Sequence, residues 1–93
     1  MKTKITQRIV QDLAPKAKEY EIWDTELDGF KVRVRASGAA SYLFTYRRPK
    51  NGLRTTVTIG QTSQLSAAVA RDQAWSFAGE VRKGNDPALD PKR

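Results

Sequence analysis

The sequence predicts an α+β domain, in which a short N-terminal helix precedes a three-stranded antiparallel meander with one short extra strand. A long C-terminal helix is expected to cover one face of that sheet. Three observations support this fold class. Residues 30–36, 41–48 and 53–60 alternate between apolar and polar side chains, as strands with one buried face do. Gly, Pro, Asn and Ser residues lie between these runs, and apolar residues recur at helical spacing from residue 65 to residue 81.

The first helix is expected to begin after Thr6. A threonine side chain can accept a hydrogen bond from a free N–H group of the first helical turn, so Thr6 suits the N-cap position. Ile5 and Val10 have the spacing of a hydrophobic staple. Pro15 disfavours helical backbone at the residue before it, and the helix therefore ends at or before Ala14.

Residues 20–24 alternate weakly and predict a short strand ahead of the meander. Trp23 in this strand has two interpretations. It is a core residue, which its neighbour Ile22 favours, or it is a stacking platform for a base. The polar residues that follow predict a turn, in which Gly29 is free to take a positive φ before the strand that starts at Phe30.

The three runs of the meander place apolar side chains on one face and cations or threonines on the other. Loops at residues 37–40 and 49–52 join the strands. The dipeptide Asn51-Gly52 is a strong hairpin signal, because both residues tolerate a positive φ. The residues expected on the open face are Lys31, Arg33, Arg35, Thr45, Arg47, Arg54, Thr56 and Thr58.

A second helix is expected from Ser66, its N-cap, to about Lys83, and Gly84 is a suitable residue to end it. Its apolar stripe would cover the buried face of the sheet. We therefore expect one domain over residues 1–84, followed by a proline-containing linker over residues 85–93 that leads to something absent from this sequence. The stripe consists of Leu65, Ala70, Ala74, Phe77, Ala78 and Val81.

The net charge of +7 is concentrated in the middle of the chain. Between Asp28 and Asp72 the sequence contains eight Lys or Arg residues and no carboxylate that would oppose them. An excess of cations confined to a sheet and its turns is the electrostatic pattern of a nucleic-acid-binding surface. The alternative is a solvated sheet face on which Lys and Arg prevent pairing with other chains.

The amino-acid composition lacks the side chains that most catalytic mechanisms require. The 93 residues include neither Cys nor His, so the usual general base, the thiolate nucleophile and the commonest metal ligands are missing. The sequence has no pattern for a metal, a cofactor, a phosphate loop or a small-molecule substrate. No apolar run is long enough to span a membrane. We therefore expect a non-catalytic cytoplasmic protein that uses no cofactor.

An exposed row of Arg and Thr side chains on a sheet suits the major groove of double-stranded DNA. That groove admits β-strands. One Arg side chain can donate hydrogen bonds to the O6 and N7 atoms of a guanine at the same time, and Thr can contact bases or phosphates. Residues at loops and strand ends, namely Arg48, Lys50 and Arg54, are expected to hold phosphates. The predicted DNA-contacting residues are Lys31, Arg33, Arg35, Thr45, Arg47, Arg48, Lys50, Arg54, Thr56 and Thr58.

Residues 20–34, YEIWDTELDGFKVRV, resemble the "WD…L.GF.LRV" signature of N-terminal arm-type DNA-binding domains in tyrosine-recombinase integrases of prophages and genomic islands. The order of the later motifs is also similar, and the resemblance runs from about Ile5 to Pro87. Two residues depart from the pattern, because Lys31 stands where the family often has Gly and Thr45 where it often has Arg. The later motifs are a hairpin glycine (Gly38), "S-aromatic-hydrophobic" (residues 41–43), "YR" (46–47), "LTLG" (57–60), "LS.AEAR" (65–71) and "G.DP" (84–87).

The resemblance implies that the sheet enters the major groove at accessory, arm-type attachment sites and so serves integration of a mobile element. It also implies that the linker leads to a core-binding domain and a catalytic domain with a tyrosine nucleophile, so that this chain binds DNA without cutting it. The expected partner is double-stranded DNA in a bacterial cytoplasm, at the nucleoid, with other integrase protomers and accessory DNA-bending proteins as further candidates. Two alternatives stay open: a double-stranded RNA-binding module with the same order of elements, and a module that docks an acidic protein.

Overall fold

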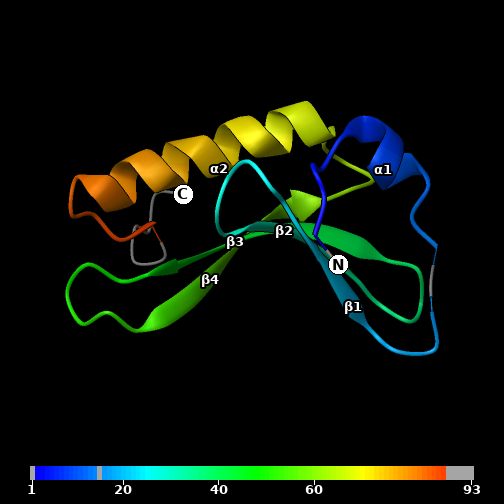
Figure 1. The fold of residues 1–93 in the computed structure, drawn as a ribbon, viewed down its shortest axis with the longest axis horizontal. Coiled ribbons are helices and arrows are strands. Elements are labelled where there is room, and N and C mark those ends of the chain that lie inside the picture. The colour runs from blue at the N-terminus through cyan, green and yellow to red at the C-terminus, as the bar shows by residue number, and fades with distance from the viewer. Residues whose placement is uncertain (1, 15, 88–93) are drawn as a thin grey trace.

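The computed structural model describes residues 2–14 and 16–87, and it confirms the α+β fold (Figure 1). A four-stranded antiparallel sheet in the order β1-β2-β3-β4 forms one layer, and the long helix α2 lies along one side of it as the second layer. The short helix α1 lies near the first turns of α2. The elements in chain order are α1 (Gln7–Gln11), β1 (Tyr20–Trp23), β2 (Phe30–Val34), β3 (Ala40–Arg47), β4 (Arg54–Gln61) and α2 (Ala67–Arg82).

The sheet is a continuous meander, since each strand pairs with the next one in sequence. The β1–β2 register sets Ile22 opposite Val32, and the β2–β3 register sets Val32 opposite Tyr42. Directly paired residues share a face of the sheet, so these three side chains form one row on the side that α2 covers. Between β3 and β4 the register shifts by one residue at Ile59, which is a β-bulge.

Residues before α1 also touch the sheet, which the sequence pattern did not predict. Lys2 forms an isolated parallel bridge with Trp23, and the Thr3 N–H donates to the Trp23 carbonyl at 2.9 Å. Because β1 is an edge strand, this short segment covers backbone groups that would otherwise be open to pairing.

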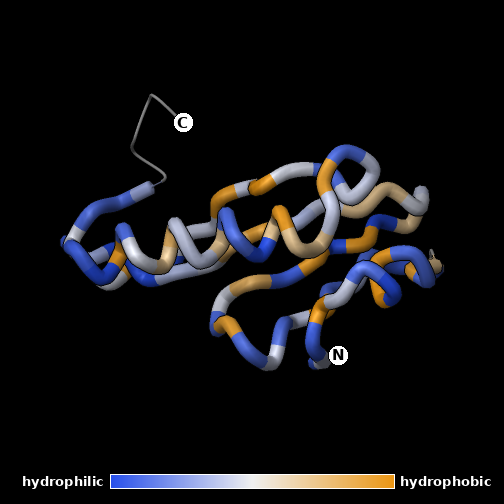
Figure 2. Tube along the Cα trace, turned by 90° about the horizontal axis from the view of Figure 1, so that it is seen from above, coloured by the Kyte–Doolittle hydropathy of each residue, from blue (hydrophilic) through white to orange (hydrophobic). Residues whose placement is uncertain are grey.

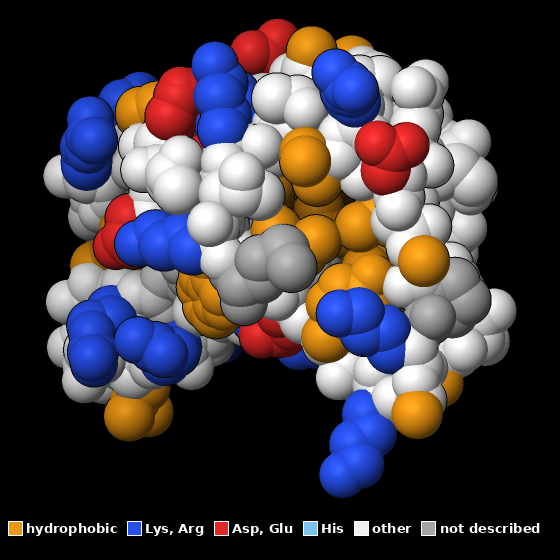
Figure 3. All heavy atoms as spheres, turned by 45° about the vertical axis from the view of Figure 1, so that its right-hand side comes forward, with side chains coloured by type: hydrophobic (Ala, Val, Ile, Leu, Met, Phe, Trp, Pro, Cys, Tyr) orange, Lys and Arg blue, Asp and Glu red, His pale blue; other side chains and the backbone are white. Residues whose placement is uncertain are grey.

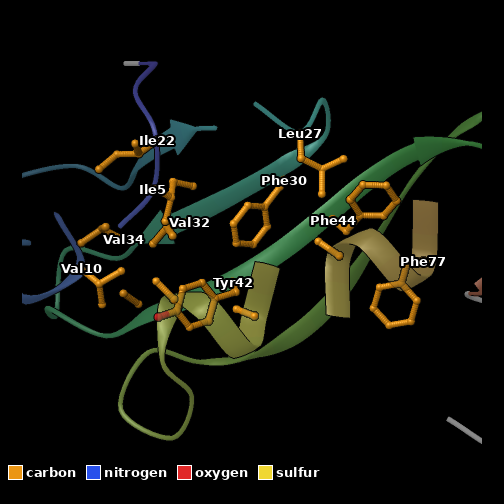
Figure 4. Packing of buried hydrophobic residues seen from close by; sticks show 14 of the residues in the cluster. Ile5, Val10, Ile22, Leu27, Phe30, Val32, Val34, Tyr42, Phe44 and Phe77 are labelled. Carbon is orange, nitrogen blue, oxygen red and sulfur yellow. The ribbon is translucent and has the colours of Figure 1, made fainter. Parts of the chain in front are cut away.

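The core lies between α2 and the sheet, where the predicted alternation places it. Hydrophobic positions recur along the strands and along α2 (Figure 2), and the side chains of Phe30, Val32 and Tyr42 are fully buried. Figure 4 shows them packed in one cluster with residues from every layer. Ala70 and Ala74 of α2 are fully buried as well. Their small side chains let the helix approach the sheet closely, and dense packing of this kind is what stabilises the two layers.

Both helices begin at the predicted caps. The Thr6 hydroxyl accepts from the Ile9 N–H, and the Ser66 hydroxyl accepts from the Val69 N–H, each at 3.3 Å. Helix α2 ends at Arg82, and Gly84 takes a φ of +90°. That left-handed conformation ends helices at little cost when the residue is glycine.

A buried carboxylate, Asp24, joins three segments that are far apart in sequence. It accepts hydrogen bonds from the Ile5 N–H at 2.9 Å and from the Leu27 N–H at 2.7 Å. Arg71 of α2 donates to it from both terminal nitrogens, at 2.8 and 2.7 Å, and also donates to the Ile5 carbonyl. Burial acts to raise the pKa of Asp24, but these hydrogen bonds and the Arg71 charge outweigh it and lower the pKa to about 2. The ionised carboxylate therefore stabilises the fold.

The positive φ expected at Gly29 is confirmed, and Gly52 in the β3–β4 loop also takes one. Gly29 takes a φ of +94°, and a Cβ atom there would lie 2.2 Å from the Thr45 carbonyl oxygen. Gly52 takes a φ of +71°, but Asn51 has a negative φ, since only glycines have positive values in the part of the chain that the structure describes. The β3–β4 loop is longer than a two-residue turn and needs one left-handed residue rather than two.

Candidate nucleic-acid interface

The open face of the sheet lies opposite α2 and is built from alternate residues of all four strands. Residue pairs on this face include Glu21 with Arg33, Trp23 with Lys31, and Thr45 with Thr56. The predicted cations and threonines of β2, β3 and β4 therefore do share one face. The side chains on it are Glu21, Trp23, Lys31, Arg33, Ser41, Leu43, Thr45, Arg47, Arg54, Thr56 and Thr58.

Strand β1 brings a carboxylate into this face, and the expectation that its cations are unopposed is wrong for β2. Lys31 Nζ donates to Glu21 Oε2 at 3.0 Å. Arg33 donates to the same oxygen from Nε at 3.1 Å and from Nη2 at 2.9 Å. Glu19 lies farther out, 3.8 Å from Arg33 Nε and 3.9 Å from Arg35 Nη1. The sequence segment 29–71 contains no acid, but pairing with β1 supplies acids from outside that segment.

The Glu21 carboxylate is held ionised by its two cationic neighbours. Burial acts to raise the pKa of Glu21, but the hydrogen bonds from Lys31 and Arg33, together with their charges, lower it overall. Three donors converge on a single oxygen of this group. The arrangement fixes the Arg33 guanidinium on the open face.

Trp23 lies on the open face, so its interpretation as a core residue is wrong. The Lys31 ammonium sits 4.5 Å from the centre of the Trp23 ring, in cation–π contact. The alternation of residues 20–23 could have shown this, because Tyr20 and Ile22 face the core and their neighbours must then face away. The same alternation also places Glu21 on the open face, although Glu21 was not among the residues predicted there.

The centre of the open face is buried from solvent. Lys31 is 5% exposed, Thr45 is 8% exposed, and Leu43 between them is also buried. The hydroxyls of Thr45 and Thr56 hydrogen-bond to each other at 2.9 Å. Of the predicted contact residues, Lys31 and Thr45 are therefore the least accessible, while Thr56 and Thr58 are exposed.

The β3–β4 end of the face carries accessible cations. Arg47 and Arg54 face each other across the last pair of the two strands, and Lys50 lies in the loop beyond them. All three are exposed, and within residues 2–14 and 16–87 none has a carboxylate within 4 Å. Asp28 lines a hollow with Arg47 and Arg54 without pairing with either. This end of the sheet is where free positive charge gathers.

Arg48, by contrast, is engaged by the first residues of the predicted linker. Its Nε lies 3.5 Å from Asp86 Oδ2 and donates to the Thr55 hydroxyl at 2.9 Å. The Tyr46 hydroxyl donates to the other oxygen of Asp86, and Pro87 is buried. Residues 85–87 thus pack on the domain, while the boundary after Gly84 stays a prediction and residues 88–93 lie outside the described part.

Away from the open face, the described residues form a hollow on the side of α1. Figure 3 brings the α1 side forward and shows an apolar hollow surrounded by charged side chains. A hollow lined by Ile5, Ala67 and Arg71 lies between the segment before α1 and the start of α2. Among the described residues no three carboxylates are grouped as metal ligands would be, and neither described helix is long and apolar enough to cross a membrane.

Comparison with known proteins agrees with the character of the face. The family model described as "Arm DNA-binding domain" matches residues 2–93, which is nearly the whole chain. No curated protein matches the sequence.

Proposed function

The chain belongs to the Arm DNA-binding domain family, a non-catalytic DNA-binding domain found in phage integrases, and on that premise we propose how it binds. The open sheet face enters the major groove of double-stranded DNA at an accessory, arm-type site of an attachment region. Binding there serves site-specific recombination, in which a mobile element such as a prophage integrates.

The observation that carries this proposal is the group of free cations at the β3–β4 hairpin. Arg47, Lys50 and Arg54 have no carboxylate partner among the described residues, whereas Arg33, Arg35 and Lys31 on the β1–β2 side are each paired. A cation that is solvated and unpaired can neutralise a phosphate without first breaking an ion pair. We therefore expect the hairpin to supply most of the electrostatic binding energy.

The dimensions of the hairpin suit the groove. Strands β3 and β4 are eight residues long each, which corresponds to roughly 26 Å. Two paired strands lie about 4.8 Å apart, and the major groove of B-form DNA is about 12 Å wide and admits a two-stranded ribbon. The exposed side chains of Thr56 and Thr58 would then face base edges, while the cations at the strand ends reach phosphates on either side.

Fluorescence anisotropy with labelled duplexes tests this proposal. The purified chain would be titrated with attachment-region DNA, random DNA and duplex RNA across a salt series. The double variant Arg47→Ala/Arg54→Ala should bind DNA more weakly, and its salt slope should be shallower by about 0.9 for each phosphate that the variant no longer neutralises. A matched control is Arg82→Ala/Lys83→Ala, which removes the same charge from the exposed end of α2.

Each outcome has a clear meaning. Weakened binding in the sheet variant alone supports the open face as the DNA surface. Equal weakening in both variants means that total charge matters and the face does not. Equal or tighter binding to duplex RNA would favour the RNA-binding alternative, and no binding to any duplex at low salt would favour an acidic protein partner.

We also propose the context in which the domain acts. In such a protein the chain after residue 84 leads to a core-binding domain and to a catalytic domain with a tyrosine nucleophile. Other integrase protomers and accessory DNA-bending proteins would share the attachment site, in the bacterial cytoplasm at the nucleoid. Tethering to further domains raises the effective local concentration, so a weak interaction of this single module with DNA would suffice.

A further inference from the structure

Glu21, on the edge strand β1, places a carboxylate on a face that meets phosphates. Glu21 repels DNA phosphates, and it also neutralises part of the charge that Lys31 and Arg33 would otherwise offer. Removing an acid from a DNA-binding face should therefore strengthen binding, unless the acid has a function there. The contacts of Glu21 indicate what that function is.

Arg33 is held by Glu21 along one edge of its guanidinium and leaves another edge free. The side edge, formed by Nε and Nη2, donates to Glu21 Oε2 at 3.1 and 2.9 Å. Nη1 has no hydrogen-bond partner among the described residues. A guanidinium carries five N–H donors in a fixed plane, so the end edge formed by Nη1 and Nη2 still presents two parallel donors. Two parallel donors are what the O6 and N7 acceptors of guanine require.

The surroundings leave room for a base edge at this position. Arg33 lines a hollow of about 150 Å³ on the open face, together with Arg35, Ser41, Leu43 and Thr58. The second cation on Glu21, Lys31, is 5% exposed and packed on Trp23. Lys31 therefore helps to hold the Glu21 carboxylate in place, and that carboxylate in turn holds the Arg33 guanidinium.

We propose that Glu21 is a positioning residue that orients Arg33 to read a guanine in the major groove. The inference rests on the proposed function, because it assigns a specificity device to the same face. An Arg33 side chain held in this way is less free to move toward a phosphate. The Glu21–Arg33 pair therefore lowers the affinity for non-specific DNA and raises the discrimination between bases. Arg33 touches the base, and Glu21 acts through it.

Selection from a randomised duplex library, followed by binding measurements on single-base variants of the selected site, tests the proposal. The wild-type chain should prefer guanine at one position by about 5- to 150-fold, the range expected of a good bidentate contact. Glu21→Ala, which removes the oxygen that accepts from Arg33, should lose that preference to within about threefold, keep the preferences at other positions, and bind random DNA at least as tightly as the wild type. Glu19→Ala is the matched control, since it removes the same charge near Arg33 but takes away no hydrogen bond: the nearest Glu19 oxygen lies 3.8 Å from Arg33 Nε.

A second variant keeps the test decisive if Glu21→Ala fails to fold. Arg33→Lys retains the charge but has no planar pair of donors, and it should lose the same guanine preference. Retention of the full preference in Glu21→Ala, or in Arg33→Lys, overturns the proposal, as does equal loss in Glu19→Ala. DNA binding without any base preference in the wild type also overturns it but leaves the proposed function standing, whereas absence of all DNA binding overturns both.

Discussion

Replacing the buried Asp24 by asparagine is the sharpest test of how this small domain is held together. Asparagine has nearly the same shape as a protonated aspartate, so Asp24→Asn removes the charge with little change in volume. The charge is what Arg71 and three backbone N–H groups bind. The variant should therefore behave at neutral pH as the wild type would if this single carboxyl were protonated.

The expected loss follows from the pKa. The pKa of Asp24 is lowered from 3.8 to about 2 in the folded chain, and each pH unit corresponds to about 1.36 kcal/mol. The ionised group thus contributes about 2.4 kcal/mol at pH 7. Because the folded-state value is the lower one, this contribution is complete above about pH 5 and is lost as the pH falls toward 2, with about 1.3 kcal/mol left at pH 3.

Urea unfolding monitored by tryptophan fluorescence at several pH values measures the difference. The free energy of unfolding of Asp24→Asn should be about 2.4 kcal/mol below that of the wild type at pH 7, and the gap should shrink to about half at pH 3. Asp72→Asn is the control, because Asp72 is exposed on α2, and its effect should stay within about 0.5 kcal/mol. A gap below about 1 kcal/mol at pH 7, or one that does not change with pH, would mean that the charge of Asp24 does not stabilise the fold in this way.

Two further predictions concern the backbone and can be checked by thermal unfolding. Gly29→Ala places a methyl group 2.2 Å from a carbonyl oxygen of β3 at a φ of +94°, and should cost more than about 2 kcal/mol. Gly52→Ala, at a φ of +71° in open space, should cost only about 1–2 kcal/mol; equal losses would mean that the close approach is unimportant. Ser66→Ala removes the cap of α2 and should cost about 1 kcal/mol, whereas Ser76→Ala on the exposed side of the helix should cost less than about 0.5 kcal/mol.

Most of the fold could be predicted because it depends on local patterns. Alternation within each run determined which side chains of β2, β3 and β4 face the core, and the caps at Thr6 and Ser66 follow from residue type alone. The hairpin loops were found by composition. The interpretation of Trp23 as a core residue was wrong, and the contact of residues 2–3 with β1 was not predicted.

The candidate site was harder to predict, because its electrostatics depend on which strands are neighbours. Alternation places Lys31 and Arg33 on a face but does not reveal that β1 sets Glu21 opposite Arg33. Likewise Asp24 and Arg71 lie 47 positions apart, and nothing local to either residue indicates that they pair. Both belong to motifs of the family resemblance, in "WD" and in "AEAR", and their hydrogen bonds give a structural reason for those motifs.

The central claim is that the open sheet face, and the β3–β4 hairpin above all, is the surface that meets DNA. Titration of the isotope-labelled chain with duplex DNA, followed by amide NMR shifts, tests it most directly. We expect the largest changes in β3, β4 and the loop at residues 48–53, with smaller ones in β2, while the exposed side of α2 stays unchanged. Changes concentrated along α2 and α1, with the hairpin unaffected, would contradict it.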